Sequence, residues 1–250
     1  MLAAWLKKNY VFIWWSLLLL FSSPAILLLQ RYRDDSLGFN PLETLMHTTG
    51  RWALIFLLAS LTITPLRRGL AKFSRHMHSA YGKRLSDWNW IIRLRRMIGL
   101  YSFFYATLHL AIFMHFDIGW DGPAMLEEFQ EKPYIFAGIL GFLLLLPVAI
   151  TSTNAMMRRL GNNWRRLHRL VYVITVLVLL HYWWQVKVGI TSPVPYTVVA
   201  VYLLGYRLIT HFGWLVNRPA DDGMEVPEKG RHQADNERRV ETLSEATSVN

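Results

Sequence analysis

An apolar segment long enough to cross a bilayer, residues 167–187, carries a histidine near each end. The segment is LHRLVYVITVLVLLHYWWQVK, and its histidines are His168 and His181. Titratable side chains inside a membrane are costly, so those that persist there usually serve a ligand, an ion or a proton. Imidazole is a common axial ligand of haem iron. We therefore predict a membrane haem protein that moves electrons, in which another helix supplies a second ligand.

Further apolar segments predict an all-α membrane protein rather than a soluble domain. Hydrophobic residues form 53% and aromatic residues 14% of the 250-residue chain, well into the range of membrane proteins. We predict one membrane domain, residues 1–216, built as a bundle of six transmembrane helices. The predicted helices cover about residues 10–29, 44–64, 97–116, 134–151, 167–187 and 196–214.

The net charge of +10 arises mainly from loops between the apolar segments. Residues 66–96 hold nine basic side chains and residues 153–166 hold four arginines, whereas residues 117–132 are mainly acidic. Basic loops stay on the cytoplasmic side of a membrane, so both termini are predicted to be cytoplasmic. The cytoplasmic position of the basic loops explains the net positive charge without a nucleic-acid partner. The polar tail, residues 217–250, is predicted to be disordered and cytoplasmic.

Aromatic side chains alternate with the basic ones in residues 66–96, including Phe73, Tyr81, Trp88 and Trp90. This pattern favours a segment that lies among the lipid headgroups. The more specific alternative is a binding site for a flavin or a quinone headgroup. The spacing of the residues does not distinguish this alternative from a segment among the lipid headgroups.

Two histidines on different predicted helices lie at nearly the same depth. At about 1.5 Å per residue, His109 lies roughly 18 Å from the helix start at Met97, and His181 roughly 21 Å from Leu167. Such a pair can approach one iron from opposite faces, so we predict that His109 and His181 are axial ligands of one haem. The alternative is that each is a hydrogen-bonded core histidine. Cysteine is absent, which excludes thiolate-ligated haem and cysteine-ligated iron–sulfur clusters.

Three further residues are candidates for cofactor binding. Arg51 lies level with the histidine pair, where a haem propionate would stabilise its charge. His47, one turn away, is predicted to assist it or to serve as an alternative ligand, and an interfacial polar cluster is the competing interpretation for both. His168 cannot share the iron of His181 and is a candidate for a second haem or another cofactor. His211 is a weaker candidate as its partner, and the remaining histidines are interpreted as surface residues: His76, His78, His115 and His232.

Several spaced motifs resemble one family. They are HTTGR (47–51), ITPLRR (63–68), RRMIGLYSFFYATLHL (95–110), TSTNAM (151–156), LGNNWRRLHRLVY (160–172) and HYWWQVK (181–187). Together they closely resemble the MsrQ family, which belongs with the ferric-reductase-like transmembrane proteins. The resemblance implies a multi-pass protein of the bacterial inner membrane that binds haem b and FMN, with functional histidines at His109, His168 and His181.

The resemblance also implies the electron donor and acceptor. Electrons are expected to come from quinol of the respiratory pool and to pass to MsrP, a periplasmic molybdoenzyme that reduces methionine sulfoxide in oxidised proteins. The chain is then an electron-transfer subunit without catalytic residues of its own. A tail of about 34 residues is too short for the flavin and nucleotide domain that ferric reductases append, so a separate donor is expected.

Two other classes of protein remain as alternatives. A transporter could use the histidines and Arg51 to relay protons or to bind a transition metal ion. A membrane scaffold would bind a partner without redox chemistry. Low-spin haem has a characteristic visible spectrum, which neither alternative would show.

Overall fold

The described part of the chain is helical, and no strand occurs in it. The computed structural model describes residues 9–77, 84, 88–185 and 192–216. The chain divides into two units, residues 1–207 and 208–250. The first contains the bundle described below. Of the second, residues 208–216 are described and form the end of the last helix, so the predicted disorder of the tail lies outside the described residues.

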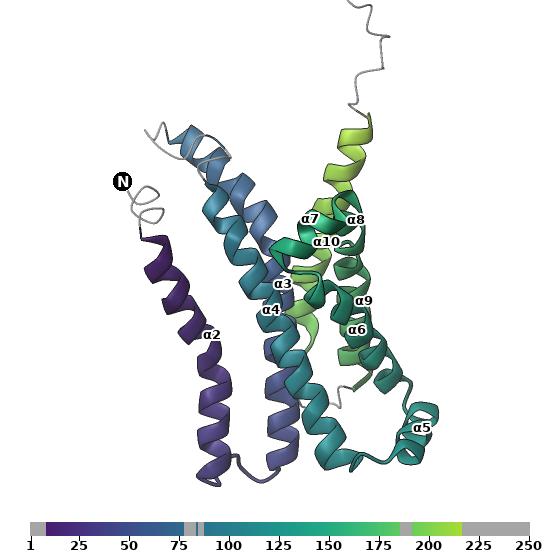
Figure 1. Ribbon diagram of the computed structural model, residues 1–250. Coiled ribbons are helices and arrows are strands. Elements are labelled where there is room, and N and C mark those ends of the chain that lie inside the picture. The colour runs from purple at the N-terminus through teal and green to yellow at the C-terminus, as the bar shows by residue number, and fades with distance from the viewer. Residues whose placement is uncertain (1–8, 78–83, 85–87, 186–191, 217–250) are drawn as a thin grey trace, which may run out of the picture. The chain divides into compact units, whose positions relative to one another are not determined.

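Figure 1 shows the helices in chain order. They are α2 (Tyr10–Arg33), α3 (Pro41–His76), α4 (Asn89–Ile112), η2 (Phe113–Asp117), α5 (Gly122–Glu131), α6 (Pro133–Ile150), α7 (Asn154–Leu160), α8 (Asn162–Leu167), α9 (Leu170–Gln185) and α10 (Val194–Val216). Element η2 is a single π-helical turn. Helix α5 lies in the acidic segment that was predicted to be a loop.

Five helices are long and apolar enough to cross a membrane. They span Val11–Arg33, Pro41–His76, Trp90–Asp117, Pro133–Ile150 and Asn162–Gln185. The chain is therefore a multi-pass membrane protein in which five of the six predicted spans are found. The sixth corresponds to α10, a helix of 23 residues that is not among these five. The count of six and the side of the membrane on which the termini lie stay predictions.

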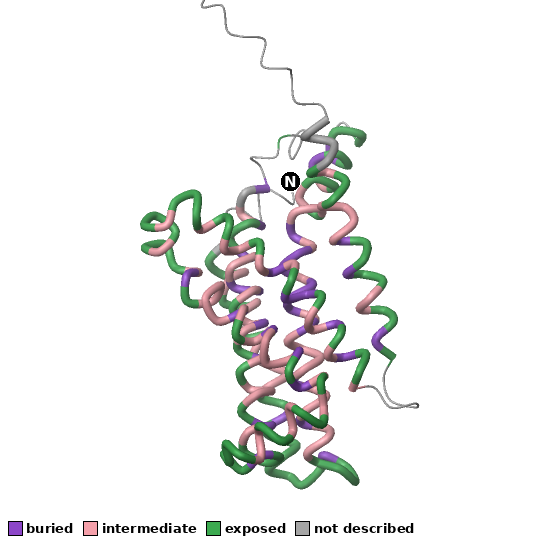
Figure 2. Tube along the Cα trace, turned by 90° about the vertical axis from the view of Figure 1, so that its right-hand side faces the viewer, coloured by how far each residue is buried: buried purple, intermediate pink, exposed green. Residues whose placement is uncertain are grey.

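Helix α3 lies at the centre of the core of the first unit. It packs along α4, while α6 packs along α9, as the ribbons in Figure 1 show. One buried cluster joins α3 to α4 through Phe56 and Tyr105. A second joins α3 to α6 and α9 through Leu61, Leu145 and Ile174. Figure 2 shows buried positions on the inner faces and exposed positions on the outer faces, the pattern expected of spans whose outer surface meets lipid.

Two helix boundaries differ most from those predicted from the sequence. Helix α3 was predicted to end at Pro65, but it continues through this proline to His76. Proline lacks the N–H that would bond the carbonyl of Leu61 four residues earlier, and Arg207 Nη2 donates to that carbonyl instead, at 3.2 Å. Helix α4 begins at Asn89 rather than at Met97. Arg95, predicted to lie in a loop, is therefore a helical residue.

A tyrosine of α4 completes a broken turn of α2. Helix α2 contains Pro24. The Tyr105 hydroxyl lies between two backbone groups of α2, at the N–H of the next residue, Ala25. It donates to the carbonyl of Phe21 at 2.8 Å and accepts from the N–H of Ala25 at 3.1 Å. These are the two groups that an unbroken helix would join to each other. Tyr105 is only 1% exposed, so this contact ties α2 to the bundle.

The predicted topology can be tested with reporter fusions. Fusions at about residue 80 and at the C-terminus are expected to report cytoplasm, and a fusion at about residue 125 periplasm. Residue 80 lies in the basic segment 66–96, and residue 125 lies in the acidic segment 117–132. An odd number of crossings between the first two sites would contradict the six-span topology.

Candidate functional site

Helix α3 holds the ring of His109, which lies on α4. The Nδ1 atom of His109 lies 3.0 Å from the carbonyl oxygen of Met46. A carbonyl can only accept a hydrogen bond, so Nδ1 carries the proton and Nε2 keeps a free lone pair. The ring fits because α3 has a glycine there: a Cβ at Gly50 would lie 3.3 Å from Nδ1 and Cε1.

Helix α6 holds the ring of His181, which lies on α9, in the same way. The Nδ1 atom of His181 lies 2.6 Å from the carbonyl oxygen of Tyr134. The proton is therefore on Nδ1, and Nε2 again keeps its lone pair. A Cβ at Gly138 would lie 2.7 Å from Nδ1, a distance that real Cβ contacts do not reach. Glycine at this position is thus required by the ring.

The two histidines share one supporting arrangement. In each case a neighbouring helix offers a carbonyl at one position and a glycine four residues later, Met46 with Gly50 on α3 and Tyr134 with Gly138 on α6. Histidines that ligate metals almost always donate their other ring N–H to a carbonyl or carboxylate, which sets the tautomer and the ring orientation. Both rings are therefore prepared as Nε2 ligands.

The separation of the two rings suits one metal ion between them. Their centroids lie 6.2 Å apart, with the ring planes at 82°. Two imidazoles on opposite sides of one metal have centroids about 6 Å apart, from two bonds of about 2 Å and two ring radii of about 1 Å. Haem iron accepts two nitrogen ligands in this arrangement, so the donor set, its tautomers and its separation all fit haem.

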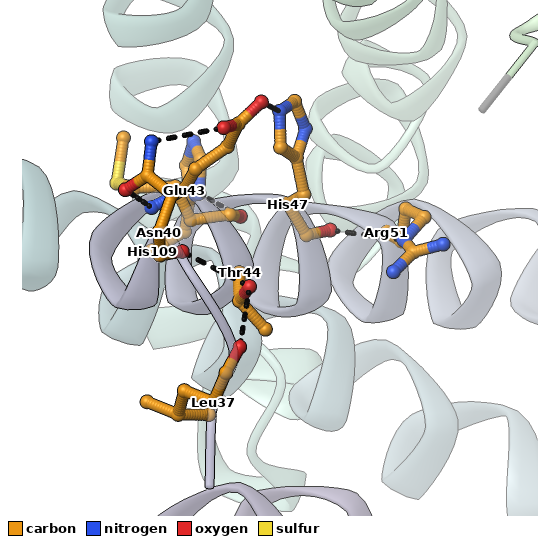
Figure 3. Close-up of polar contacts among 8 residues, drawn as sticks. Leu37, Asn40, Glu43, Thr44, His47, Arg51 and His109 are labelled. Carbon is orange, nitrogen blue, oxygen red and sulfur yellow. Dashed lines mark hydrogen bonds and ion pairs between the residues drawn. The ribbon is translucent and has the colours of Figure 1, made fainter. Parts of the chain in front are cut away.

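A cavity of about 170 Å³ lies between the helices, and both histidines stand in its wall. His47 and Arg51 of α3 line it as well. Figure 3 shows that Arg51 extends along α3 away from Glu43; its Nε donates to the carbonyl oxygen of His47 at 3.2 Å. Its terminal N–H groups make no hydrogen bond or ion pair with the residues that the structure describes, so they can bind an anion in the cavity. The His47 ring is engaged by Glu43, with Nε2 3.5 Å from Oε1.

The mouth of the cavity carries charges of both signs. Asp117, Glu128 and Lys132 line it there, and Lys132 Nζ lies 2.6 Å from a carboxylate oxygen of Glu128. This hydrogen bond raises the pKa of Lys132 above its ordinary value. The lysine therefore stays positively charged at the mouth of the site at neutral pH.

The structure brings together four of the five predicted site residues: His109, His181, His47 and Arg51 line one cavity. His168 is not among the residues that line it. It lies in the break between α8 and α9, where its Nδ1 donates to the carbonyl of Trp164 at 3.0 Å and its Nε2 lies 3.4 Å from Ser152 Oγ. The carbonyls of Met46 and Tyr134 were missed because backbone acceptors leave no mark on a sequence. A glycine inside each of two apolar spans, at positions 50 and 138, was the available signal.

Known proteins similar to this chain agree on one family. The family described as "Ferric reductase like transmembrane component" matches residues 49–179. The protein-methionine-sulfoxide reductase heme-binding subunit MsrQ of Herminiimonas arsenicoxydans is 49% identical over 175 residues, covering 68% of this chain and 72% of that protein. The MsrQ of Ralstonia nicotianae is 44% identical over 193 residues, 76% of this chain and 79% of its own. The MsrQ of Xanthomonas euvesicatoria is 44% identical over 175 residues, 70% and 73% respectively.

An all-helical membrane bundle with two histidine rings 6.2 Å apart, matched over more than half its length by that family, is a ferric-reductase-like transmembrane protein. Within this class, the chain belongs to the MsrQ family. The resemblance seen in the sequence motifs is thereby confirmed.

Proposed function

We propose that the chain is the haem-binding electron-transfer subunit of a protein-methionine-sulfoxide reductase system. The observation that carries this proposal is the pair of imidazoles at 6.2 Å, each with Nδ1 bonded to a carbonyl and Nε2 left free. The relatives' names describe a heme-binding subunit of such a reductase. A bound haem b would supply one-electron transfer.

The residues of the chain hold the cofactor and set its surroundings. His109 and His181 are the proposed axial ligands, and Arg51 is the proposed partner of a propionate, since a guanidinium binds a carboxylate through paired hydrogen bonds. His47, whose ring is engaged by Glu43, is proposed to support that end of the site rather than to ligate iron. The cavity wall is otherwise largely apolar, including Leu54, which keeps water away from the rings.

The proposed donor is quinol in the inner membrane, and the proposed acceptor is the periplasmic enzyme MsrP. No three histidine, cysteine or carboxylate side chains gather to hold a metal ion in the described residues. This observation favours the haem protein over a metal transporter built on protein ligands alone. FMN is proposed as a further cofactor from the family resemblance, and reduction of methionine sulfoxide is assigned to the partner.

The proposal is tested by following haem absorbance in the purified full-length protein. The reduced protein is expected to show the sharp bands of low-spin haem, and quinol without NAD(P)H is expected to reduce it. Reoxidation is expected to require both MsrP and methionine sulfoxide. Absence of the haem bands would refute the assignment of haem as the cofactor. Equally fast reoxidation without MsrP would refute MsrP as the electron acceptor. A requirement for a nicotinamide-dependent reductase would refute quinol as the electron donor.

A further inference from the structure

A groove of about 910 Å³ lies between α2 and α4, and α7 lines one end of it. None of its lining residues also lines the cavity of the histidine pair. Its volume is within the range of sites that enclose a small molecule. The groove is therefore a second candidate binding site, separate from the first.

The groove follows one face of α4 from charged to apolar residues. Arg93 and Arg96 lie at its start, and Leu100 and Phe104 follow at intervals of four residues. Residues at this spacing lie on the same side of a helix. From Arg93 to Phe104 the helix rises about 16 Å, which is about half the thickness of the hydrocarbon core of a bilayer. The groove thus has the length of one lipid leaflet and carries its charge at one end.

The charged end of the groove is positive only. Helices α2, α4 and α7, which line it, contain no acidic residue. Nη2 of Arg96 donates to Oδ1 of Asn154 at 2.6 Å, which holds the guanidinium where α7 meets the groove. A guanidinium has five N–H groups, and no ion pair among the described residues involves Arg96. Its other N–H groups can bind the oxygens of a phosphate, an anion that guanidinium groups bind well.

The apolar end of the groove suits a hydrocarbon chain. Leu100 and Phe104 are 40% and 46% exposed, so their side chains are open to an occupant. The hydroxyls of Ser22 and Tyr101 both donate to the carbonyl oxygen of Leu18, at 2.9 and 2.7 Å. A hydroxyl has one hydrogen, so neither can donate to a ligand. An acyl chain needs no donor there, whereas a carbonyl of a neutral quinone headgroup would stay unpaired.

A tryptophan of α2 lies at the charged end. The Oγ atom of Ser22 lies 2.7 Å from the hydroxyl of Tyr101. Further along both helices, the N–H of Ala25 donates to the hydroxyl of Tyr105 at 3.1 Å. Helices α2 and α4 therefore run in the same direction, which puts Trp14, two turns before Ser22, level with the arginines. An indole N–H at this level suits the polar part of a lipid.

We propose that this groove binds one anionic phospholipid. The phosphate lies at Arg96, and one acyl chain follows the face of α4 as far as Phe104. The headgroup carries a net negative charge, because the end of the groove that receives it has arginines and no carboxylate. The site shares no residue with the histidine cavity, so its existence does not depend on the proposed function.

Binding is tested by native mass spectrometry of the full-length protein in mild detergent. Phosphatidylglycerol and phosphatidylcholine with the same acyl chains are added in equal amounts, and the lipid that stays bound is counted. We expect the wild type to retain phosphatidylglycerol in preference to phosphatidylcholine. Arg96→Gln is expected to weaken binding of phosphatidylglycerol about tenfold or more, since it removes charge-assisted hydrogen bonds. Arg96→Lys, which keeps the charge, is expected to retain part of the affinity.

A second variant tests the apolar end, and a third is the matched control. Leu100→Trp places a larger side chain in the groove at a partly exposed position, and it is expected to lower retention of the lipid without removing a charge. Arg166→Gln removes an exposed arginine of α8 that does not line the groove. This control is expected to bind phosphatidylglycerol as the wild type does.

Three outcomes would overturn the proposal. The first is equal retention of the two lipids by the wild type. The second is an Arg96→Gln protein that binds phosphatidylglycerol as tightly as Arg166→Gln does. The third is a neutral quinone that stays bound in Arg96→Gln and is lost in Leu100→Trp, which would give the groove a different occupant. Size-exclusion chromatography and haem absorbance of the same samples report on folding and on the histidine site, so the two proposals fail separately.

Discussion

Alanine at His109 or at His181 is expected to abolish the low-spin haem spectrum. Each substitution removes one of the two proposed Nε2 ligands, whose rings lie 6.2 Å apart. Loss of one ligand leaves a five-coordinate iron or releases haem altogether, and both outcomes remove the sharp bands of the reduced protein. The measurement is the visible spectrum with the haem-to-protein ratio of the purified variants.

Two other histidines serve as controls for this prediction. His115 is exposed on η2, so His115→Ala is expected to keep the wild-type spectrum. His168→Ala is also expected to keep the bands that arise from the His109–His181 pair, because His168 lies outside that cavity. Wild-type haem content in both His109→Ala and His181→Ala would show that the pair does not hold the iron.

Gly138→Ala is expected to lower haem content nearly as strongly, although it changes no ligand. The new Cβ would lie 2.7 Å from His181 Nδ1, so the ring must move away from the Tyr134 carbonyl that orients it. Losing this support is expected to weaken haem binding by about 10- to 100-fold, the usual effect of removing a group that orients a metal ligand. Gly50→Ala is expected to have a smaller effect, because its Cβ would lie 3.3 Å from the His109 ring.

Gly99→Ala is the matched control within a spanning helix. Nothing lies within 4 Å of a Cβ at Gly99, and alanine favours helix over glycine by about 1 kcal/mol. This variant is expected to keep the haem and to unfold at the same or a higher temperature. A Gly138→Ala protein with full haem content and an unchanged spectrum would show that the close fit of His181 against α6 does not govern ligation.

Much of the fold follows from local properties of the chain. Hydropathy is a sum over a short segment, so the apolar segments are enough to identify the spans. The rise per residue of a helix is constant, so residue spacing is enough to place His109 and His181 at one depth. The same reasoning locates Arg51 beside them. The motifs that resemble the MsrQ family also depend on residues alone, and the relatives confirm the family.

The helix boundaries and the carbonyl groups that orient the two histidines depend on packing between segments far apart in the chain. Pro65 predicts a helix end, yet α3 continues because Arg207, more than a hundred residues later, bonds the carbonyl that the proline leaves free. The sequence predicts Arg95 in a loop, but α4 begins at Asn89 and includes this residue. The carbonyls of Met46 and Tyr134 gain a role only when another helix brings an imidazole within hydrogen-bond distance. Such contacts are set by which helix faces which, and that choice is a property of the assembled bundle rather than of any one segment.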